Sequence, residues 1–105
     1  MSFGIIGAGA FGTALAVSLS GKYPEVILWG RDKAHMRNLQ MHRENSRYLP
    51  GTVLPAALKP TADINQAAAQ QTLLLAIPMQ TLRQLVEDHA GLFKGKTLVA
   101  CSKGI

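Results

Sequence analysis

The sequence has little cysteine, little charge and few aromatic residues. Its 105 residues include one cysteine, which excludes an internal disulfide framework and offers no thiolate cluster for zinc. No run approaches the roughly 18 consecutive apolar residues of a membrane-spanning helix. Charged residues make up 16% and hydrophobic residues 48%, which is too apolar and too weakly charged for a disordered chain. We therefore expect a soluble globular domain from a reducing compartment.

The apolar N-terminal stretch, residues 3–19, lacks the pattern of a secretory signal peptide. Such a peptide begins with positive charge and continues through an unbroken apolar core. Here the first basic residue is Lys22, and glycines interrupt the stretch at positions 4, 7, 9 and 12. We expect a cytoplasmic enzyme domain that starts directly at its first strand.

Short apolar runs alternate with segments of helical spacing. The runs predicted to be buried strands are residues 3–6, 26–29, 58–61, 72–77 and 97–101. The predicted helices are residues 10–20, 33–43, 64–70 and 82–89, with Asp32 and Asp63 as caps of the second and third. Residues 45–60 contain three prolines and no sustained period, so they are predicted to be irregular up to the strand near 58–61.

Strands that alternate with helices predict an α/β fold with a parallel sheet covered on both faces. The five strands would form part of a Rossmann-type doubly wound sheet in the order 3-2-1-4-5, with a ligand crevice at the carboxyl ends of strands one and four. Phe11, Leu15 and Leu19 are spaced to share one face of the first helix. In the second helix, Met36 and Leu39 are predicted to face inward, with Met41 as a further candidate.

Residues 7–12, GAGAFG, match the glycine-rich motif that binds dinucleotides. Gly7 would form the tight turn, Gly9 would let the backbone approach a pyrophosphate, and Gly12 would let the helix pack on the strand. The motif follows a predicted strand and opens a predicted helix, whose free amides and dipole favour an anion. A glycine turn without a ligand is the simpler alternative.

The residue that contacts the adenosine ribose is expected at the end of the second strand. An NAD-selective site usually has an acidic residue there, whereas this chain has Gly30-Arg31-Asp32. Arg31 is predicted to bind a 2′-phosphate or to stack on adenine, which favours NADP over NAD; a solvent-exposed arginine is the alternative. Asp32 would be either a helix cap or a ribose acceptor, so the use of NAD stays open.

Two further residues are predicted to lie at the crevice. Pro78 would place a rigid turn against the nicotinamide ring, or would only end a strand. Lys103 would project from the end of the fifth strand and bind a substrate hydroxyl or phosphate, or would be an exposed loop lysine. Cys101 is expected to pack in its strand rather than to react. The three histidines make no metal-ligand pattern, so no metal site is predicted.

The formal net charge is +5, and basic residues concentrate between positions 31 and 47. These residues are Arg31, Lys33, Arg37, Arg43 and Arg47. They would form a nucleic-acid patch, the solvated face of a helix, or a site for a small phosphorylated ligand. The glycine motif favours the third interpretation, and no nucleic-acid partner is predicted.

Five segments together resemble the bacterial-type NAD(P)-dependent glycerol-3-phosphate dehydrogenases. In chain order they are residues 7–16, 28–32, 48–51, 75–78 and 101–105. They span essentially the whole chain at family-like spacing, which is far more specific than the glycine motif alone.

The resemblance implies reversible hydride transfer between NAD(P)H and dihydroxyacetone phosphate, giving sn-glycerol 3-phosphate for phospholipid synthesis. It places Ala10, Phe11, Arg31 and Tyr48 at the cofactor, and Lys103 at both cofactor and substrate. It also implies that residues 1–105 are the N-terminal portion of the cofactor domain, without the helical domain that carries the proposed acid/base lysine. No catalytic residue is therefore assigned, and this portion alone is expected to be inactive.

Other functions stay open at this stage. The chain would alternatively be a stand-alone dinucleotide-binding or sensing module, or part of a different reductase acting on a small acid; residues 48–51 and 102–104 argue against that reductase. Nonspecific RNA binding is the weakest alternative. The edge after the fifth strand is expected to expose apolar surface, which predicts association, with a homo-oligomer as one outcome, or marginal stability.

Overall fold

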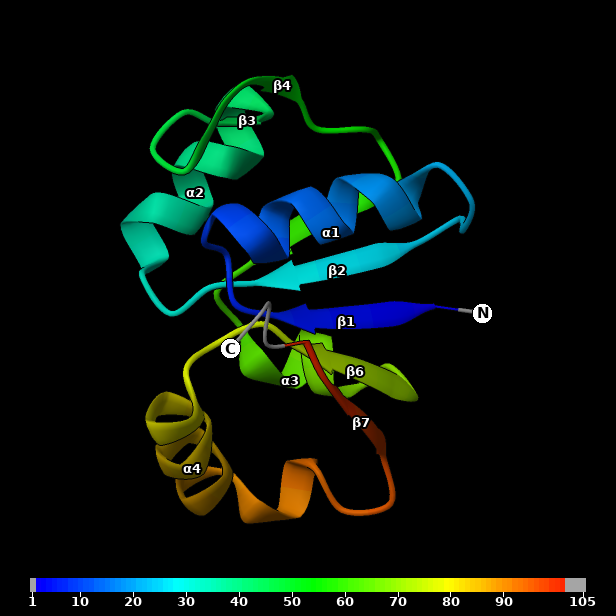
Figure 1. Cartoon of the computed structure of the whole chain (residues 1–105), viewed down its shortest axis with the longest axis vertical. Helices are drawn as coiled ribbons and strands as arrows, with labels where there is room; N and C mark the ends of the chain where they lie inside the picture. Colours follow the sequence, from blue (N-terminus) through cyan, green and yellow to red (C-terminus); the bar gives the residue numbers. More distant parts are fainter. Residues whose placement is uncertain (1, 102–105) are drawn as a thin grey trace.

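A five-stranded parallel sheet forms the centre of the computed structural model, which describes residues 2–101 (Figure 1). Its strands are β1 (Phe3–Ile6), β2 (Val26–Trp29), β5 (Leu58–Thr61), β6 (Thr72–Leu75) and β7 (Thr97–Ala100). They lie in the order β5-β2-β1-β6-β7, which is the predicted order 3-2-1-4-5 when only the strands of this sheet are numbered. The prediction of a Rossmann-type sheet is confirmed.

Helices cover both faces of the sheet. They are α1 (Ala10–Ser20), α2 (Lys33–His42), α3 (Ile64–Ala68) and α4 (Met79–Asp88), followed by the short 3-10 helix η1 (Ala90–Leu92). The first two helices pack on one face and the other two on the opposite face (Figure 1). Successive residues of β1 alternate between these layers, since Ile5 belongs to one apolar cluster and Ile6 to the other. Burial on both sides explains why the central strands β1, β2 and β6 consist mainly of apolar residues.

The register of the sheet brings the loops of the site together. At the carboxyl end of β1, Ile6 pairs with Trp29 of β2 on one side and with Leu75 of β6 on the other. The loops that follow these three strands therefore leave the same edge of the sheet side by side.

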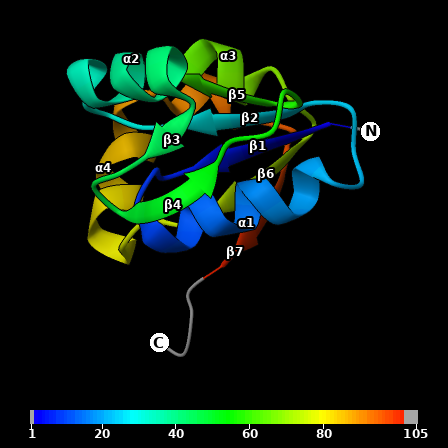
Figure 2. The same ribbon diagram turned by 90° about the horizontal axis from the view of Figure 1, so that it is seen from above.

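The segment predicted to be irregular contains a second sheet, so that prediction is wrong there. Strands β3 (Glu44–Asn45) and β4 (Leu49–Val53) pair antiparallel and lie beside α1 and α2 (Figure 2). Pro50 and Gly51 obscure β4 in the sequence, because both residues are unfavourable in strands. An edge strand tolerates them, and Gly51 adopts a φ of +85°.

Two details of the predicted helix faces also differ. On α1 the buried residues are Gly12, Thr13 and Ala16, whereas Phe11 is exposed and lies outside the buried face. These small side chains let α1 lie close to the strand. On α2 the predictions for Met36 and Leu39 are confirmed, but Met41 is exposed because it points away from the face that they share.

The two predicted helix caps are confirmed, but two of the elements are shorter than predicted. The Asp32 and Asp63 carboxylates accept backbone N–H groups at the starts of α2 and α3. The third helix ends at Ala68 rather than near residue 70, and β6 ends at Leu75 rather than at residue 77. Within residues 2–101, no helix has the length and apolar character needed to cross a membrane, and no cluster of His, Cys, Asp and Glu could hold a metal ion.

Candidate functional site

A cleft of about 670 Å³ opens at the edge where β1, β2 and β6 end. It is walled by the loops after these strands, by α4 and by the loop between β3 and β4. Its lining residues are Gly7, Ala8, Gly9, Trp29, Gly30, Arg31, Asp32, His35, Arg47, Tyr48, Ile77, Pro78, Thr81, Gln84, Leu85, Asp88 and His89. The cleft lies where the sequence predicts a ligand crevice, and its volume is typical of small-molecule and cofactor sites.

Gly7 begins the turn from β1 into α1. Its φ is +123°, a conformation that side-chain-bearing residues rarely adopt. A Cβ atom there would lie 2.5 Å from the Ala76 carbonyl oxygen and 2.7 Å from Cγ2 of Ile77. Its N–H donates to the Trp29 carbonyl at 2.9 Å. Both backbone conformation and close packing therefore require glycine at this position.

The start of α1 has the features of an anion site. Gly9 is the N-cap, no side chain caps the helix, and the first turn holds no acidic residue. A Cβ on Gly9 would meet nothing within 4 Å, whereas one on Gly12 would collide with the Gly7 carbonyl. The first helical hydrogen bond runs from the Thr13 N–H to the Gly9 carbonyl at 3.0 Å. The amides before Thr13 have no partner within the helix, and the space in front of Gly9 is open.

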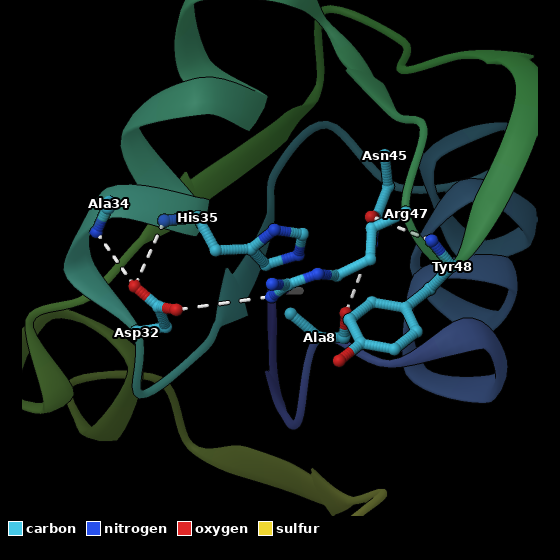
Figure 3. Close-up of polar contacts among 7 residues, drawn as sticks. All are labelled: Ala8, Asp32, Ala34, His35, Asn45, Arg47 and Tyr48. Carbon is cyan, nitrogen blue, oxygen red and sulfur yellow. Dashed lines mark hydrogen bonds and ion pairs between the residues drawn. The ribbon is translucent and has the colours of Figure 1, made fainter.

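Asp32, Arg47 and Tyr48 form a contact group at the end of β2 (Figure 3). Asp32 Oδ1 accepts the backbone N–H groups of Ala34 and His35 at 3.0 and 3.2 Å. Of the two roles expected for Asp32, the structure therefore shows the helix cap. Its other oxygen, Oδ2, lies 3.9 Å from Nη1 of Arg47. The Arg47 guanidinium in turn lies 5.6 Å from the centre of the Tyr48 ring. One carboxylate oxygen of Asp32 thus caps α2, and the other faces the Arg47 guanidinium.

His35 lines the cleft next to Asp32, Arg47 and Tyr48. Its ring meets the Tyr48 ring edge-on at 5.5 Å, and its Nε2 atom is buried without a hydrogen-bond partner among the described residues. Burial lowers the pKa of His35 below 6.5, and the Arg47 guanidinium lowers it further. The Asp32 carboxylate and the Ala8 carbonyl oppose this shift of the pKa. The imidazole is accordingly neutral at pH 7.

Asn45 joins the parts of the site, a role that no motif in the sequence indicates. Its side chain is completely buried, at 0% exposure. Nδ2 donates to the Ala8 carbonyl at 3.0 Å, and Oδ1 accepts the Tyr48 N–H at 3.3 Å (Figure 3). Nδ2 also donates to Thr13 Oγ1 at 2.8 Å. The glycine turn, α1 and the β3–β4 loop therefore share one buried amide. No periodic pattern surrounds residue 45, so its burial was not predictable locally.

The structure brings most of the predicted site residues to the cleft edge. Those that line it are Gly7, Gly9, Arg31, Tyr48 and Pro78. Ala10, Phe11 and Gly12 lie in the first turn of α1, next to the cleft but outside its lining. Pro78 is the N-cap of α4. Lys103 lies outside the described residues.

The basic residues between positions 31 and 47 do not form one patch. Arg31 and Arg47 line the cleft. Arg43 instead donates through Nη2 to the carbonyl oxygens of Pro55 and Leu58, both at 2.7 Å, and so holds the loop before β5. The two remaining residues are exposed on α2.

Comparison with known proteins gives a consistent set of relatives. A family model described as NAD-dependent glycerol-3-phosphate dehydrogenase N-terminus matches residues 2–105. A glycerol-3-phosphate dehydrogenase (NAD(P)+) from Ruegeria sp. (strain TM1040) is 51% identical over 105 residues, which are 100% of this chain and 32% of the relative. That from Roseobacter denitrificans is 50% identical with the same coverage. The chain thus spans about a third of the length of these curated relatives.

A solved structure agrees with the sequence comparisons. The crystal structure of glycerol-3-phosphate dehydrogenase from Coxiella burnetii superposes with a TM-score of 0.87 at 29% sequence identity. The match covers 98% of this chain and 34% of that one.

Proposed function

The chain belongs to the NAD-dependent glycerol-3-phosphate dehydrogenase N-terminus family, and from this premise we propose that it is the cofactor-binding part of a glycerol-3-phosphate dehydrogenase. The proposed reaction interconverts dihydroxyacetone phosphate and sn-glycerol 3-phosphate. The nicotinamide of the bound cofactor supplies the hydride chemistry. We further propose that residues 1–105 are the N-terminal portion of the cofactor domain, and that the enzyme acts in the cytoplasm to supply phospholipid synthesis.

The observation that carries the proposal is the open, uncapped start of α1 beside Gly9. A dinucleotide diphosphate is anionic and needs N–H donors at close range. The amides of Ala10, Phe11 and Gly12 are the donors that the helix itself leaves unused. Gly9 contributes by lacking a side chain where the diphosphate would approach. The residues present therefore fit this group.

The adenosine half would lie against the end of β2. Arg31 lines the cleft there, and Tyr48 offers an exposed aromatic ring at the same end. Asp32 Oδ1 caps α2 and Oδ2 faces the Arg47 guanidinium, which offsets part of the negative charge that would oppose a 2′-phosphate. These features support a preference for NADP over NAD through Arg31 and a 2′-phosphate.

The nicotinamide half would lie toward the loop after β6. Pro78 lines this part of the cleft and begins α4, so its rigid backbone would limit where the ring can sit. Lys103 is proposed to contact both cofactor and substrate. No residue of this chain is proposed as the acid or base of the reaction.

Calorimetric titration of the chain with NADPH and with NADH tests the proposal. We expect both to bind at one site per chain, with NADPH binding more tightly. The proposed function would be contradicted if neither NADPH nor NADH binds. Trp29 lines the cleft and is the one tryptophan of the sequence, so quenching of its fluorescence provides an independent readout of the same site.

The Arg31→Glu variant tests the preference for NADP. Replacing a cation by an anion beside the 2′-phosphate is expected to weaken NADPH binding at least about tenfold more than NADH binding, since hydrogen bonds to charged groups contribute about 1.5–3 kcal/mol. The measurement is the ratio of the two dissociation constants. Arg37→Glu is the matched control, because Arg37 is exposed on α2 and does not line the cleft. Equal weakening of both cofactors would remove the 2′-phosphate role.

A further inference from the structure

The ion pair between Asp32 and Arg47 stands at the position that distinguishes the two cofactors. A free carboxylate at the end of β2 would favour ribose hydroxyls and repel a 2′-phosphate. Asp32 is not free, because Oδ1 caps α2 and Oδ2 faces the Arg47 guanidinium at 3.9 Å. Arg47 therefore offsets the negative charge of Asp32 where that charge would oppose a phosphate.

Arg47 contributes little to the stability of the fold. The side chains of Arg47 and Asp32 are 59% and 58% exposed, and ion pairs at such sites are weak. The helix cap does not depend on Arg47, since it uses the other carboxylate oxygen. An exposed arginine that lines the cleft and has no large structural contribution is available to a ligand.

Arg47 and Arg31 reach the cleft from different elements. Arg31 follows β2 directly, whereas Arg47 belongs to the β3–β4 loop that Asn45 ties to the glycine turn. The Tyr48 ring lies beside the Arg47 guanidinium at 5.6 Å, which favours a defined position for that group. A guanidinium has five N–H donors, so it can face Asp32 with one edge and a phosphate oxygen with another.

We propose that Arg47 is a second specificity-determining residue for a 2′-phosphorylated dinucleotide, acting by neutralising Asp32 and by facing the 2′-phosphate together with Arg31. The inference rests on the proposed function of the cleft. The inference goes beyond that function by assigning cofactor selectivity to Asp32 and Arg47, which are 15 positions apart in the sequence and lie on either side of α2 in the chain.

A double-mutant cycle with Arg47→Ala and Asp32→Asn tests this inference by calorimetric titration with NADPH and NADH. Asparagine caps helices as well as aspartate does, so Asp32→Asn removes the charge and keeps the cap. Arg47→Ala is expected to weaken NADPH binding about tenfold or more, the effect of losing a charge-assisted contact, and to change NADH binding less than about twofold. In the Arg47→Ala background, Asp32→Asn is expected to recover NADPH affinity several-fold, because the uncompensated carboxylate is gone.

Arg47→Gln keeps a polar side chain without the charge and is expected to give the same selective loss. Arg37→Ala removes a charge from α2 outside the cleft and is expected to leave both affinities unchanged. Equal loss of NADPH and NADH binding in the Arg47 variants, or no recovery in the double variant, would overturn the inference while the unmodified chain still binds both cofactors. If the unmodified chain binds neither cofactor, the proposed function itself fails.

Discussion

Gly7 and Gly9 lack side chains for different reasons. Gly7 has a positive φ, and any Cβ there would strike the backbone of the β6 loop. Gly9 has an ordinary φ of −79°, and a Cβ there would enter open space. Nothing in the protein itself therefore requires glycine at position 9. The absence of a side chain at position 9 therefore fits the proposed approach of a diphosphate and is not explained by the fold.

Gly9→Val is expected to abolish binding of both NADPH and NADH while leaving the fold intact. The valine would occupy the space proposed for the diphosphate, and its effect on the free energy of unfolding should stay within about 1 kcal/mol, the difference between a good and a poor N-cap. Calorimetric titration and urea denaturation measure the two effects. Gly7→Ala is the contrasting variant, since its positive φ makes it destabilising by about 1–3 kcal/mol. Retained binding in Gly9→Val would show that the diphosphate lies elsewhere.

His35 is expected to make stability depend on pH. Its pKa in the folded chain is below 6.5, so the unfolded state binds a proton at a higher pH than the folded state does. The contribution of His35 to stability is thus complete above pH 6.5 and falls as the pH drops toward its folded-state pKa. The groups that face this ring are Arg47, Asp32, Tyr48 and the Ala8 carbonyl.

The test is the free energy of unfolding of the chain and of His35→Gln, measured by urea denaturation between about pH 5 and 8, the range in which histidines titrate. Glutamine is neutral throughout, so the slope in the acidic part of this range is expected to become shallower. His42→Gln is the control, because His42 is exposed on the last turn of α2. If the free energy of unfolding of His35→Gln varies with pH as steeply as that of the unmodified chain, the His35 imidazole does not cause the pH dependence.

At the scale of elements, the β3–β4 sheet positions one side of the site. Asn45 lies on β3 and bonds to Ala8, 37 residues earlier in the chain, and to Thr13 of α1. The same side chain accepts the Tyr48 N–H and so holds the loop that carries Arg47. The small sheet is therefore the support through which the side of the cleft that carries Arg47 and Tyr48 is fixed to the glycine turn.

Asn45→Ala is expected to destabilise the chain by about 1–3 kcal/mol, because it leaves buried polar groups with fewer partners. Binding of both cofactors should weaken as the β3–β4 loop loses its anchor. Urea denaturation gives the stability, and titration of the folded variant gives the affinity. Asn38→Ala, on the exposed face of α2, is the control and should change stability by no more than about 0.5 kcal/mol. A similar small effect in Asn45→Ala would contradict the anchoring role.

At the scale of the whole molecule, β7 is the last strand at one edge of the sheet that residues 2–101 form. All four of its residues are exposed, including Leu98 at 43% and Val99 at 41%. Among residues 2–101, β6 is its only neighbouring strand. Exposed apolar edge strands promote pairing with further chains. The apolar surface expected at this edge from the sequence is thus present.

The chain is expected to self-associate through β7 at high concentration. Val99→Lys places a charge in that contact and should weaken association at least about tenfold, since opposed like charges in an interface cost several kcal/mol. Sedimentation velocity over a range of concentrations measures the effect. Val53→Lys is the control, because Val53 is 75% exposed on β4, which belongs to the other sheet. Equal association of both variants would show that β7 is not the contact.

Local features of the sequence determined the strands of the parallel sheet, the helix caps and the glycine turn of this protein. Apolar runs, a capping aspartate and a tight turn each act over a few neighbouring residues, so their patterns are visible in one short segment. The sheet order followed from the alternation of strands and helices. For the same reason Gly7, Gly9, Arg31 and Pro78 were predictable as residues near one edge.

Only the tertiary structure decided which distant side chains meet at that edge. Asn45 is buried because the glycine turn supplies its partners, and Asp32 is paired because the β3–β4 loop brings Arg47 back across α2. Phe11 and Met41 are exposed because packing of the whole layer, and not apolar character alone, selects the buried face of a helix. These contacts join residues far apart in the chain, and no local pattern encodes such distances.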